Sequence, residues 1–171
     1  GYLLGALLAN ATARALGLRR AFVLGVAGSA STLLLTAAGT DYPQFLVLRV
    51  IPGVFGAFAF VVGGVLTARM AESLGSRASF GVGLFYTGPG VGMLMAGAGV
   101  PVSLELFEHW QVAWIALGIL ACVAAWVAIR ASAAVPEGEA PNDPASGSRT
   151  TLTPALVSYT LFAAGYIGYL T

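Results

Sequence analysis

Residues 44–68 read QFLVLRVIPGVFGAFAFVVGGVLTA, and Arg49 is the one charged side chain among them. A helix that spans a bilayer needs about 20 mostly apolar residues, and this stretch supplies that length. The strands of a membrane β-barrel would instead alternate apolar and polar residues over about 10 positions. Because the stretch is apolar on all sides, it predicts a membrane-spanning α-helix.

Similar apolar runs recur along the chain and are separated by short polar breaks. We expect further spans at residues 21–39, 80–101 and 110–129, the end of an earlier span at residues 1–13 and the start of a later one at residues 154–171. The predicted fold class is therefore an all-α integral membrane protein. Since both ends of the sequence lie inside apolar runs, we expect the chain to be an internal piece of a longer protein.

The composition supports the same class. The mean hydropathy is +0.87, and 9% of the residues are charged, against about 25% in ordinary soluble domains. These values exclude a nucleic-acid-binding domain, a disordered tail and a typical soluble enzyme. The single cysteine, Cys122, excludes a cysteine-based metal site. We expect the lipid bilayer as the surroundings, no nucleic acid, no metal or cofactor, and a monomer.

The charges predict the orientation, because cytoplasmic loops collect arginine and lysine. All eight cations are arginines. Seven of them fall in alternate breaks between the predicted spans: Arg14, Arg19, Arg20, Arg69, Arg77, Arg130 and Arg149. The intervening breaks hold Asp41, Glu105, Glu108 and His109. We therefore expect the first, third and fifth breaks to be cytoplasmic.

A change in composition divides the chain into parts. Residues 131–153, ASAAVPEGEAPNDPASGSRTTLT, are rich in proline, serine, glycine and acidic residues. Such a segment buries too little apolar surface to order itself, so we interpret it as a flexible cytoplasmic linker. It would join a bundle of spans in residues 1–130 to a second bundle that begins in residues 154–171.

Arg49 is the strongest candidate for a functional residue. It lies six positions after Pro43, or roughly 9 Å along a helix, inside a predicted span. An arginine at the centre of a span costs about 2.5–3.5 kcal/mol on insertion scales. One interpretation is that its side chain extends to the outer headgroups; the other is that it faces a cavity and binds an anion or a protonatable group. The visible spans hold no acid, so a partner would be a loop acid such as Asp41, another helix or the substrate.

Glycine, proline and tyrosine mark further candidates. Glycines in a span favour close helix packing, and they are densest in residues 80–101. Pro89 lies between Gly88 and Gly90, and a proline inside a helix favours a bend. The hydroxyls of Tyr86 and Tyr166 suit a cavity wall, although tyrosine is also common in interfacial belts. The three tryptophans (Trp110, Trp114 and Trp126) are typical of such belts.

These residues resemble the major facilitator superfamily of secondary transporters. Residues 46–56, LVLRVIPGVFG, are similar to its fourth helix, in which Arg49 takes the arginine position. Residues 83–92, GLFYTGPGVG, are similar to the fifth-helix antiporter motif, with Gly88, Pro89 and Gly92 matching and Met93 replacing a second final glycine. Residues 10–20, NATARALGLRR, are similar to the loop between helices two and three through Gly17, Arg19 and Arg20, but Arg14 replaces the usual aspartate.

Within the superfamily, GYLLGALLA at residues 1–9 and GYIGYLT at residues 165–171 resemble the YbfB/YjiJ branch of bacterial transporters. The resemblance implies a partial major-facilitator bundle, with helices two to six in residues 1–130 and the start of helix seven in residues 154–171. It further implies alternating access, with a small molecule bound between two bundles near the midplane. The G-P motif favours proton-coupled export from the bacterial inner membrane, and import stays open.

Two other function classes compete with transport. An intramembrane enzyme needs converging nucleophiles, bases or metal ligands within the spans, and the predicted spans hold no His, Asp or Glu. A non-transporting subunit of a membrane assembly would not need an arginine inside a span or a linker between two bundles. We therefore expect a transporter rather than an enzyme, with the subunit as the alternative.

Overall fold

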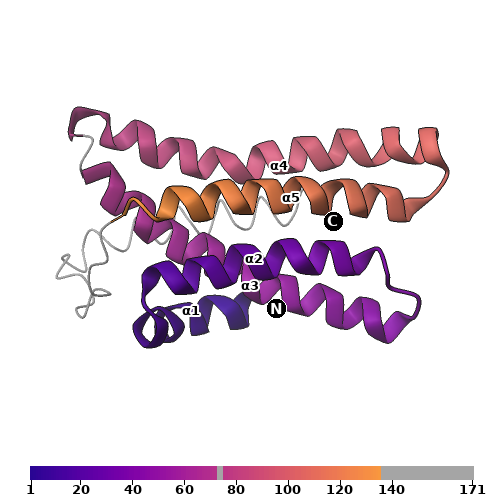
Figure 1. The fold of residues 1–171 in the computed structure, drawn as a ribbon, viewed down its shortest axis with the longest axis horizontal. Coiled ribbons are helices and arrows are strands. Elements are labelled where there is room, and N and C mark those ends of the chain that lie inside the picture. Colours follow the sequence, from indigo (N-terminus) through magenta and orange to yellow (C-terminus); the bar gives the residue numbers. More distant parts are fainter. Residues whose placement is uncertain (73–74, 136–171) are drawn as a thin grey trace, which may run out of the picture. The chain divides into compact units, whose positions relative to one another are not determined.

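The structure is a computed structural model that describes residues 1–72 and 75–135. Five α-helices follow one another in this part of the chain: α1 (Tyr2–Leu16), α2 (Leu18–Thr36), α3 (Tyr42–Glu72), α4 (Ala78–Phe107) and α5 (Trp110–Ser132). A short 3-10 helix, η1 (Gly75–Arg77), precedes α4 (Figure 1). The described residues form no strand. The all-α prediction is therefore confirmed.

Four of these helices are long and apolar enough to cross a membrane: α2, α3, α4 together with η1, and α5. They correspond to the spans predicted at residues 21–39, 44–68, 80–101 and 110–129. α1 has 15 residues, which is shorter than a full span. The chain is a multi-pass membrane protein.

The helices run beyond the apolar stretches that predicted them. α3 has 31 residues and contains Pro52, while α4 has 30 residues and contains Pro89 and Pro101. A proline inside a helix removes one backbone hydrogen bond. Membrane helices tolerate this loss because neighbouring groups and local adjustments satisfy the freed carbonyl. Both helices therefore continue through their prolines.

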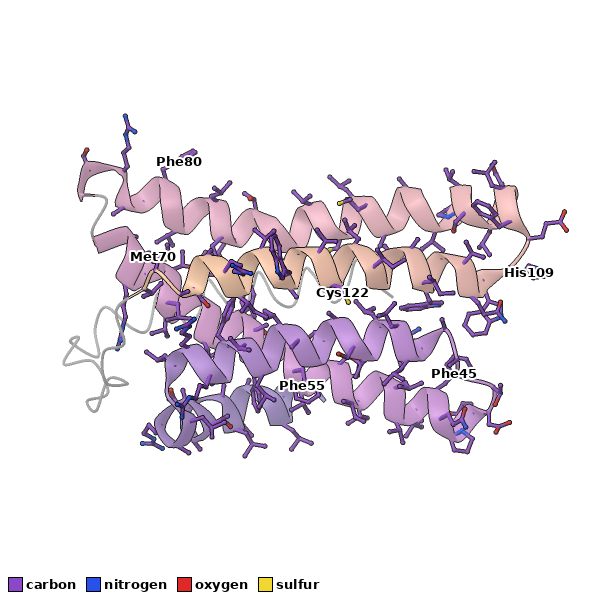
Figure 2. The ribbon with its side chains drawn as sticks, viewed as in Figure 1. Phe45, Phe55, Met70, Phe80, His109 and Cys122 are labelled. Atoms are coloured by element: carbon purple, nitrogen blue, oxygen red, sulfur yellow. The ribbon has the colours of Figure 1, made fainter. Side chains whose placement is uncertain are left out.

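The buried core lies where α3 meets α1 and α2. Its members are small or aliphatic residues with one phenylalanine: Ala9, Ala13, Leu18, Ala21, Phe58, Val62 and Leu66, together with Val135. Glycines bring the backbones close together here. A Cβ built on Gly5 would lie 2.5 Å from the carbonyl oxygen of Val54, and one built on Gly25 would lie 2.5 Å from the amide nitrogen of Ala59. Phe55 fills the space beside Gly28 in the same interface (Figure 2).

α4 differs from the other helices in its surroundings. It has no buried residue, and some of its large side chains, such as Phe80 at 73% exposure, project away from the helices beside it (Figure 2). α5 packs more closely, because a Cβ on its Gly118 would lie 2.5 Å from a methyl carbon of Leu34 on α2. The described helices therefore combine a tightly packed part, α1–α3 with α5 on α2, and a loosely covered α4.

The connections alternate between the two ends of the helices. The α1–α2 and α3–α4 connections and the end of α5 lie at one end, and the α2–α3 and α4–α5 connections lie at the other (Figure 1). Arg14, Arg69 and Arg130 occupy the last turns of α1, α3 and α5 at the first of these ends. The structure thus separates these three arginines from Asp41 and Glu108, as the charge pattern predicted. Which end is cytoplasmic stays a prediction.

Two predicted parts of the chain extend outside the described residues. α5 ends at Ser132, and backbone hydrogen bonds between residues three positions apart continue to Val135. The rest of the predicted linker, residues 136–153, and the predicted start of helix seven, residues 154–171, lie beyond them. The proposed boundaries between the bundle, the linker and the second bundle remain predictions.

Candidate functional site

Arg49 lies on α3, seven residues after the helix begins at Tyr42. Its guanidinium carbon Cζ is 4.9 Å from the centre of the Trp114 ring. Trp114 is half-buried and lies four residues after the start of α5. Both residues therefore lie one to two helical turns inside the end that carries Asp41 and Glu108. The sequence suggested an acid or an unseen group as the partner of Arg49, and the structure adds an aromatic ring.

This cation–π contact offsets only part of the energetic cost of placing an arginine inside a membrane span. Among the described residues Arg49 is exposed and Trp114 is half-buried, and a cation–π contact contributes about 0.5–1 kcal/mol at exposed sites and about 2 kcal/mol when the pair is removed from water. A guanidinium can stack on an aromatic ring through its face, and this arrangement leaves its edge donors available for hydrogen bonds. Among residues 1–72 and 75–135, no carboxylate pairs with Arg49. The arginine therefore keeps its capacity to bind an anion.

Arg49 and Trp114 both line a hollow of about 700 Å³ between α4 and α5. Ligand pockets measure about 300–1,000 Å³, so the volume suits a small molecule. The other lining residues are apolar or small: Leu33 of α2; Gly88, Val91, Gly92, Met95, Ala96, Val100 and Leu104 of α4; and Trp110, Ala113, Leu117, Leu120, Ala121 and Ala124 of α5. Arg49 is the one ionisable residue in this lining.

The predicted bend motif lies along the wall of this hollow. Gly88 and Gly92 are four residues apart, which puts them on one face of α4, and both line the hollow. Pro89 lines a neighbouring hollow of about 490 Å³, which Gly88 shares. No described atom outside the local helix lies within 4 Å of a Cβ built on Gly88 or Gly92. These glycines therefore leave the hollow open.

The neighbouring hollow contains one unusual polar atom. The hydroxyl oxygen of Ser29, on α2, is buried and has no hydrogen-bond partner in the described part of the chain. Ser29 lines this hollow beside Phe22, Phe60 and Phe85. The surroundings are otherwise apolar, so Ser29 adds one possible hydrogen-bonding group to this wall.

Tyr86 belongs to an aromatic cluster next to the hollows. Its ring makes edge contacts with Phe60 and Phe85, with centroid distances of 5.6 and 5.2 Å. Tyr86 is 54% exposed and contributes to neither of the two hollows described above. Tyr166, the other predicted cavity tyrosine, lies outside the described residues. The structure thus brings together Arg49, Gly88 and Gly92, but not Tyr86.

The predicted loop motif lies at the opposite end of the helices. Gly17 is the single residue between α1 and α2 and has φ +87° and ψ 152°. Only glycine adopts this combination without strain. Arg19 and Arg20 follow in the first turn of α2, where Arg19 is half-buried and Arg20 is exposed. These three residues therefore form a unit separate from Arg49.

Trp114 is the partner of Arg49 that sequence reasoning missed. The pattern favoured an interfacial belt for all three tryptophans, whereas the structure places both Trp110 and Trp114 in the lining of the hollow, with Trp110 also contacting Phe45 at a centroid distance of 5.6 Å. The sequence contained one signal for the contact between Arg49 and Trp114. These two residues lie at similar distances from the polar breaks at the same end of the helices, which puts them at a similar depth in the membrane. Within the described residues, no group of three or more His, Cys, Asp or Glu side chains could hold a metal ion.

Comparison with known proteins identifies one matching family. The sequence model of one protein family, described as the uncharacterised MFS-type transporter YbfB, matches residues 1–171. No curated protein and no solved structure matches the chain. The family match covers the whole sequence.

Proposed function

We propose that this chain, which belongs to the YbfB-type family of major facilitator superfamily transporters, works in secondary active transport of a small molecule by alternating access. In such transporters the substrate binds near the midplane between two bundles that rock against each other. The helices α1–α5 would form most of one bundle. The second bundle would begin in residues 154–171.

The observation that carries the proposal is Arg49 in the wall of the 700 Å³ hollow. An ionisable residue within a membrane span is expensive and by default marks a substrate or ion pathway. Arg49 has a ring beside it rather than a carboxylate, so its positive charge is available to a substrate. A helix with only a packing role would gain nothing from this charge.

The motif on α4 supports the proposed direction and coupling. Gly88, Pro89 and Gly92 resemble the antiporter motif, which favours export in exchange for protons. Pro89 removes a backbone hydrogen bond in the middle of α4, and this supports a helix that bends during transport. Met93 departs from the motif, so proton-coupled import is the alternative direction.

The setting of the protein is also part of the proposal. We place it in the bacterial inner membrane as a monomer, with Arg14, Arg69 and Arg130 on the cytoplasmic side and residues 131–153 as a cytoplasmic linker. Its partners would be the lipid bilayer, the small-molecule substrate and protons, with no nucleic acid. A cysteine introduced at Ser146 should react with a membrane-impermeant maleimide only after the cells are permeabilised.

The substitution Arg49→Ala tests the proposal. Charge-assisted hydrogen bonds contribute about 1.5–3 kcal/mol, so we expect transport at low substrate concentration to fall at least about tenfold. The assay is uptake or efflux by the full-length protein in proteoliposomes with an imposed proton gradient. Arg130→Ala is the matched control, because Arg130 contacts Trp126 at a helix end. A normal rate with unchanged pH dependence in Arg49→Ala would remove Arg49 from the transport pathway.

The same assay distinguishes a transporter from the alternative, which is a non-transporting subunit of a membrane assembly. A transporter moves its substrate when it is the sole protein in the liposome. Full-length protein that binds a partner and moves no compound from any tested class across the membrane would favour the subunit.

A further inference from the structure

The described part of the chain contains two arginine–tryptophan pairs, and they differ in what surrounds them. In one pair the Cζ of Arg49 lies 4.9 Å from the ring centre of Trp114, and the two residues come from different helices. In the other pair the Cζ of Arg130 lies 5.2 Å from the ring centre of Trp126, four residues earlier on α5. The first pair lines the large hollow; the second lies at the arginine-rich end of α5.

We propose that Trp114 is a positioning residue for Arg49, holding the guanidinium by its face so that its N–H edge binds a carboxylate group in the α4–α5 hollow. The proposal rests on the proposed function, because it identifies what Arg49 binds during transport. Trp114 itself would contact the guanidinium rather than the carboxylate.

The geometry of the guanidinium favours this division of roles. Arginine carries five N–H donors in a fixed plane, and it stacks on aromatic rings through its face. A ring on one face limits the rotation of the group, and fewer conformations are then lost when the edge forms two parallel hydrogen bonds to a carboxylate. A freely rotating arginine would lose more side-chain entropy on binding.

The lining of the hollow explains why a single carboxylate is the preferred group. Arg49 supplies one positive charge, and the lining contains no second cation and no acid. A dianion would leave one charge uncompensated in apolar surroundings, which is costly, while a neutral molecule would leave the guanidinium unpaired. The walls formed by Val91, Met95 and Leu117 suit an apolar body attached to the carboxylate.

Such a carboxylate can come from two sources. One is a substrate with an apolar body; the other is an acidic side chain of another membrane helix that packs against α4 and α5. The open face of α4, where a Cβ on Gly92 would meet nothing within 4 Å, leaves room for both. The shared chemistry is the carboxylate, and the experiment distinguishes its source.

The test uses the full-length protein in detergent with benzoate as the probe and benzamide as its neutral match. If the source is a substrate, benzoate raises the unfolding temperature and benzamide does not. Arg49→Gln then weakens benzoate binding most, Trp114→Leu weakens it at least fivefold, and Trp114→Phe stays within about threefold of the native protein. The double variant binds no more weakly than Arg49→Gln alone, because Trp114 acts through Arg49.

If the source is another helix, benzoate has no effect, but Arg49→Gln lowers the unfolding temperature of the ligand-free protein. Trp114→Leu then lowers it less and adds nothing to Arg49→Gln. Either pattern supports the proposal. The control pair, Trp126→Leu and Arg130→Gln, should leave benzoate binding and the Arg49 effect unchanged.

Several results would overturn the proposal. The first is additivity of the Trp114→Leu and Arg49→Gln effects, and the second is an Arg49→Gln variant that changes neither benzoate binding nor ligand-free stability. Should Trp114→Leu fail to fold, Arg49→Lys tests the same geometry with the ring in place. Lysine is a point charge without the planar fork, so an Arg49→Lys variant equal to the native protein would also overturn the proposal.

Failure of the proposed function would look different. If the Arg49 and Trp114 effects are coupled but the protein transports nothing in proteoliposomes, the carboxylate site is supported and the transport function is contradicted. A working transporter in which Arg49 and Trp114 act independently would retain the function and lose the positioning role.

Discussion

Gly25 on α2 and Gly90 on α4 are both glycines inside membrane-spanning helices, yet their surroundings are opposite. A Cβ on Gly25 would lie 2.5 Å from the amide nitrogen and 3.0 Å from the Cα of Ala59 on α3, whereas a Cβ on Gly90 would meet nothing within 4 Å. In lipid, helices associate through close van der Waals contact between small residues. The comparison teaches that a glycine marks an interface only when another backbone lies opposite it.

The largest effect is expected for Gly25→Ala. The added methyl group would overlap the backbone of Ala59, which cannot move aside as the end of a side chain can. Overpacking of this kind costs about 1–3 kcal/mol, and more where the neighbour is rigid. We expect a strongly lowered unfolding temperature and a low yield of folded full-length protein.

The unfolding temperature in detergent and the monodisperse fraction on size exclusion measure this effect. Gly56→Ala on α3 is a control, because the nearest atom to its added Cβ is the Ser29 hydroxyl at 4.0 Å. Equal stability of the Gly25→Ala and native proteins would show that α2 and α3 lie farther apart than described here.

An intermediate effect is expected for Gly17→Ala at the connection of α1 and α2. The position has open space around it, so the cost comes from the backbone alone. Its φ of +87° with ψ of 152° is a region that only glycine occupies freely, and strain of this kind costs about 1–3 kcal/mol.

Reversible unfolding of the full-length protein in mixed micelles would measure this loss. A D-alanine at position 17, introduced by semisynthesis, should restore the stability because positive φ suits it. Loss of stability with both L- and D-alanine would point to a steric cause instead.

The smallest effect is expected for Gly90→Ala on α4. Alanine favours a helix over glycine by about 1 kcal/mol, and no described neighbour opposes the methyl group. We expect unchanged or slightly raised stability, measured by the same thermal assay. A loss comparable to that of Gly25→Ala would show that another helix of the full-length protein lies against this face of α4.

Much of the fold follows from the sequence for physical reasons. The bilayer requires long apolar runs, so the spans at residues 21–39, 44–68, 80–101 and 110–129 each coincide with a helix. The ends of the helices were less predictable. α4 continues to Phe107 through Pro101, because backbone hydrogen bonding extends a helix into positions that the apolar pattern does not mark.

The candidate site was predictable only in part. Arg49 stands out in one sequence because a charge in a span is costly, but its contact with Trp114 depends on how α3 and α5 are rotated about their axes. A single sequence does not determine that rotation. Glycine density pointed to α4 in the same way, whereas the close backbone approaches described here involve Gly5 and Gly25. The density of glycines in a sequence shows where small residues lie, but it does not show which backbone packs opposite them.

The one-residue connection at Gly17 also has a consequence for how the protein is made. With Leu16 ending α1 and Leu18 beginning α2, the end of one helix and the start of the next lie at the same membrane surface. During insertion, Arg14, Arg19 and Arg20 would hold this turn on the predicted cytoplasmic side. Biogenesis, as much as packing, would therefore select the glycine at this turn.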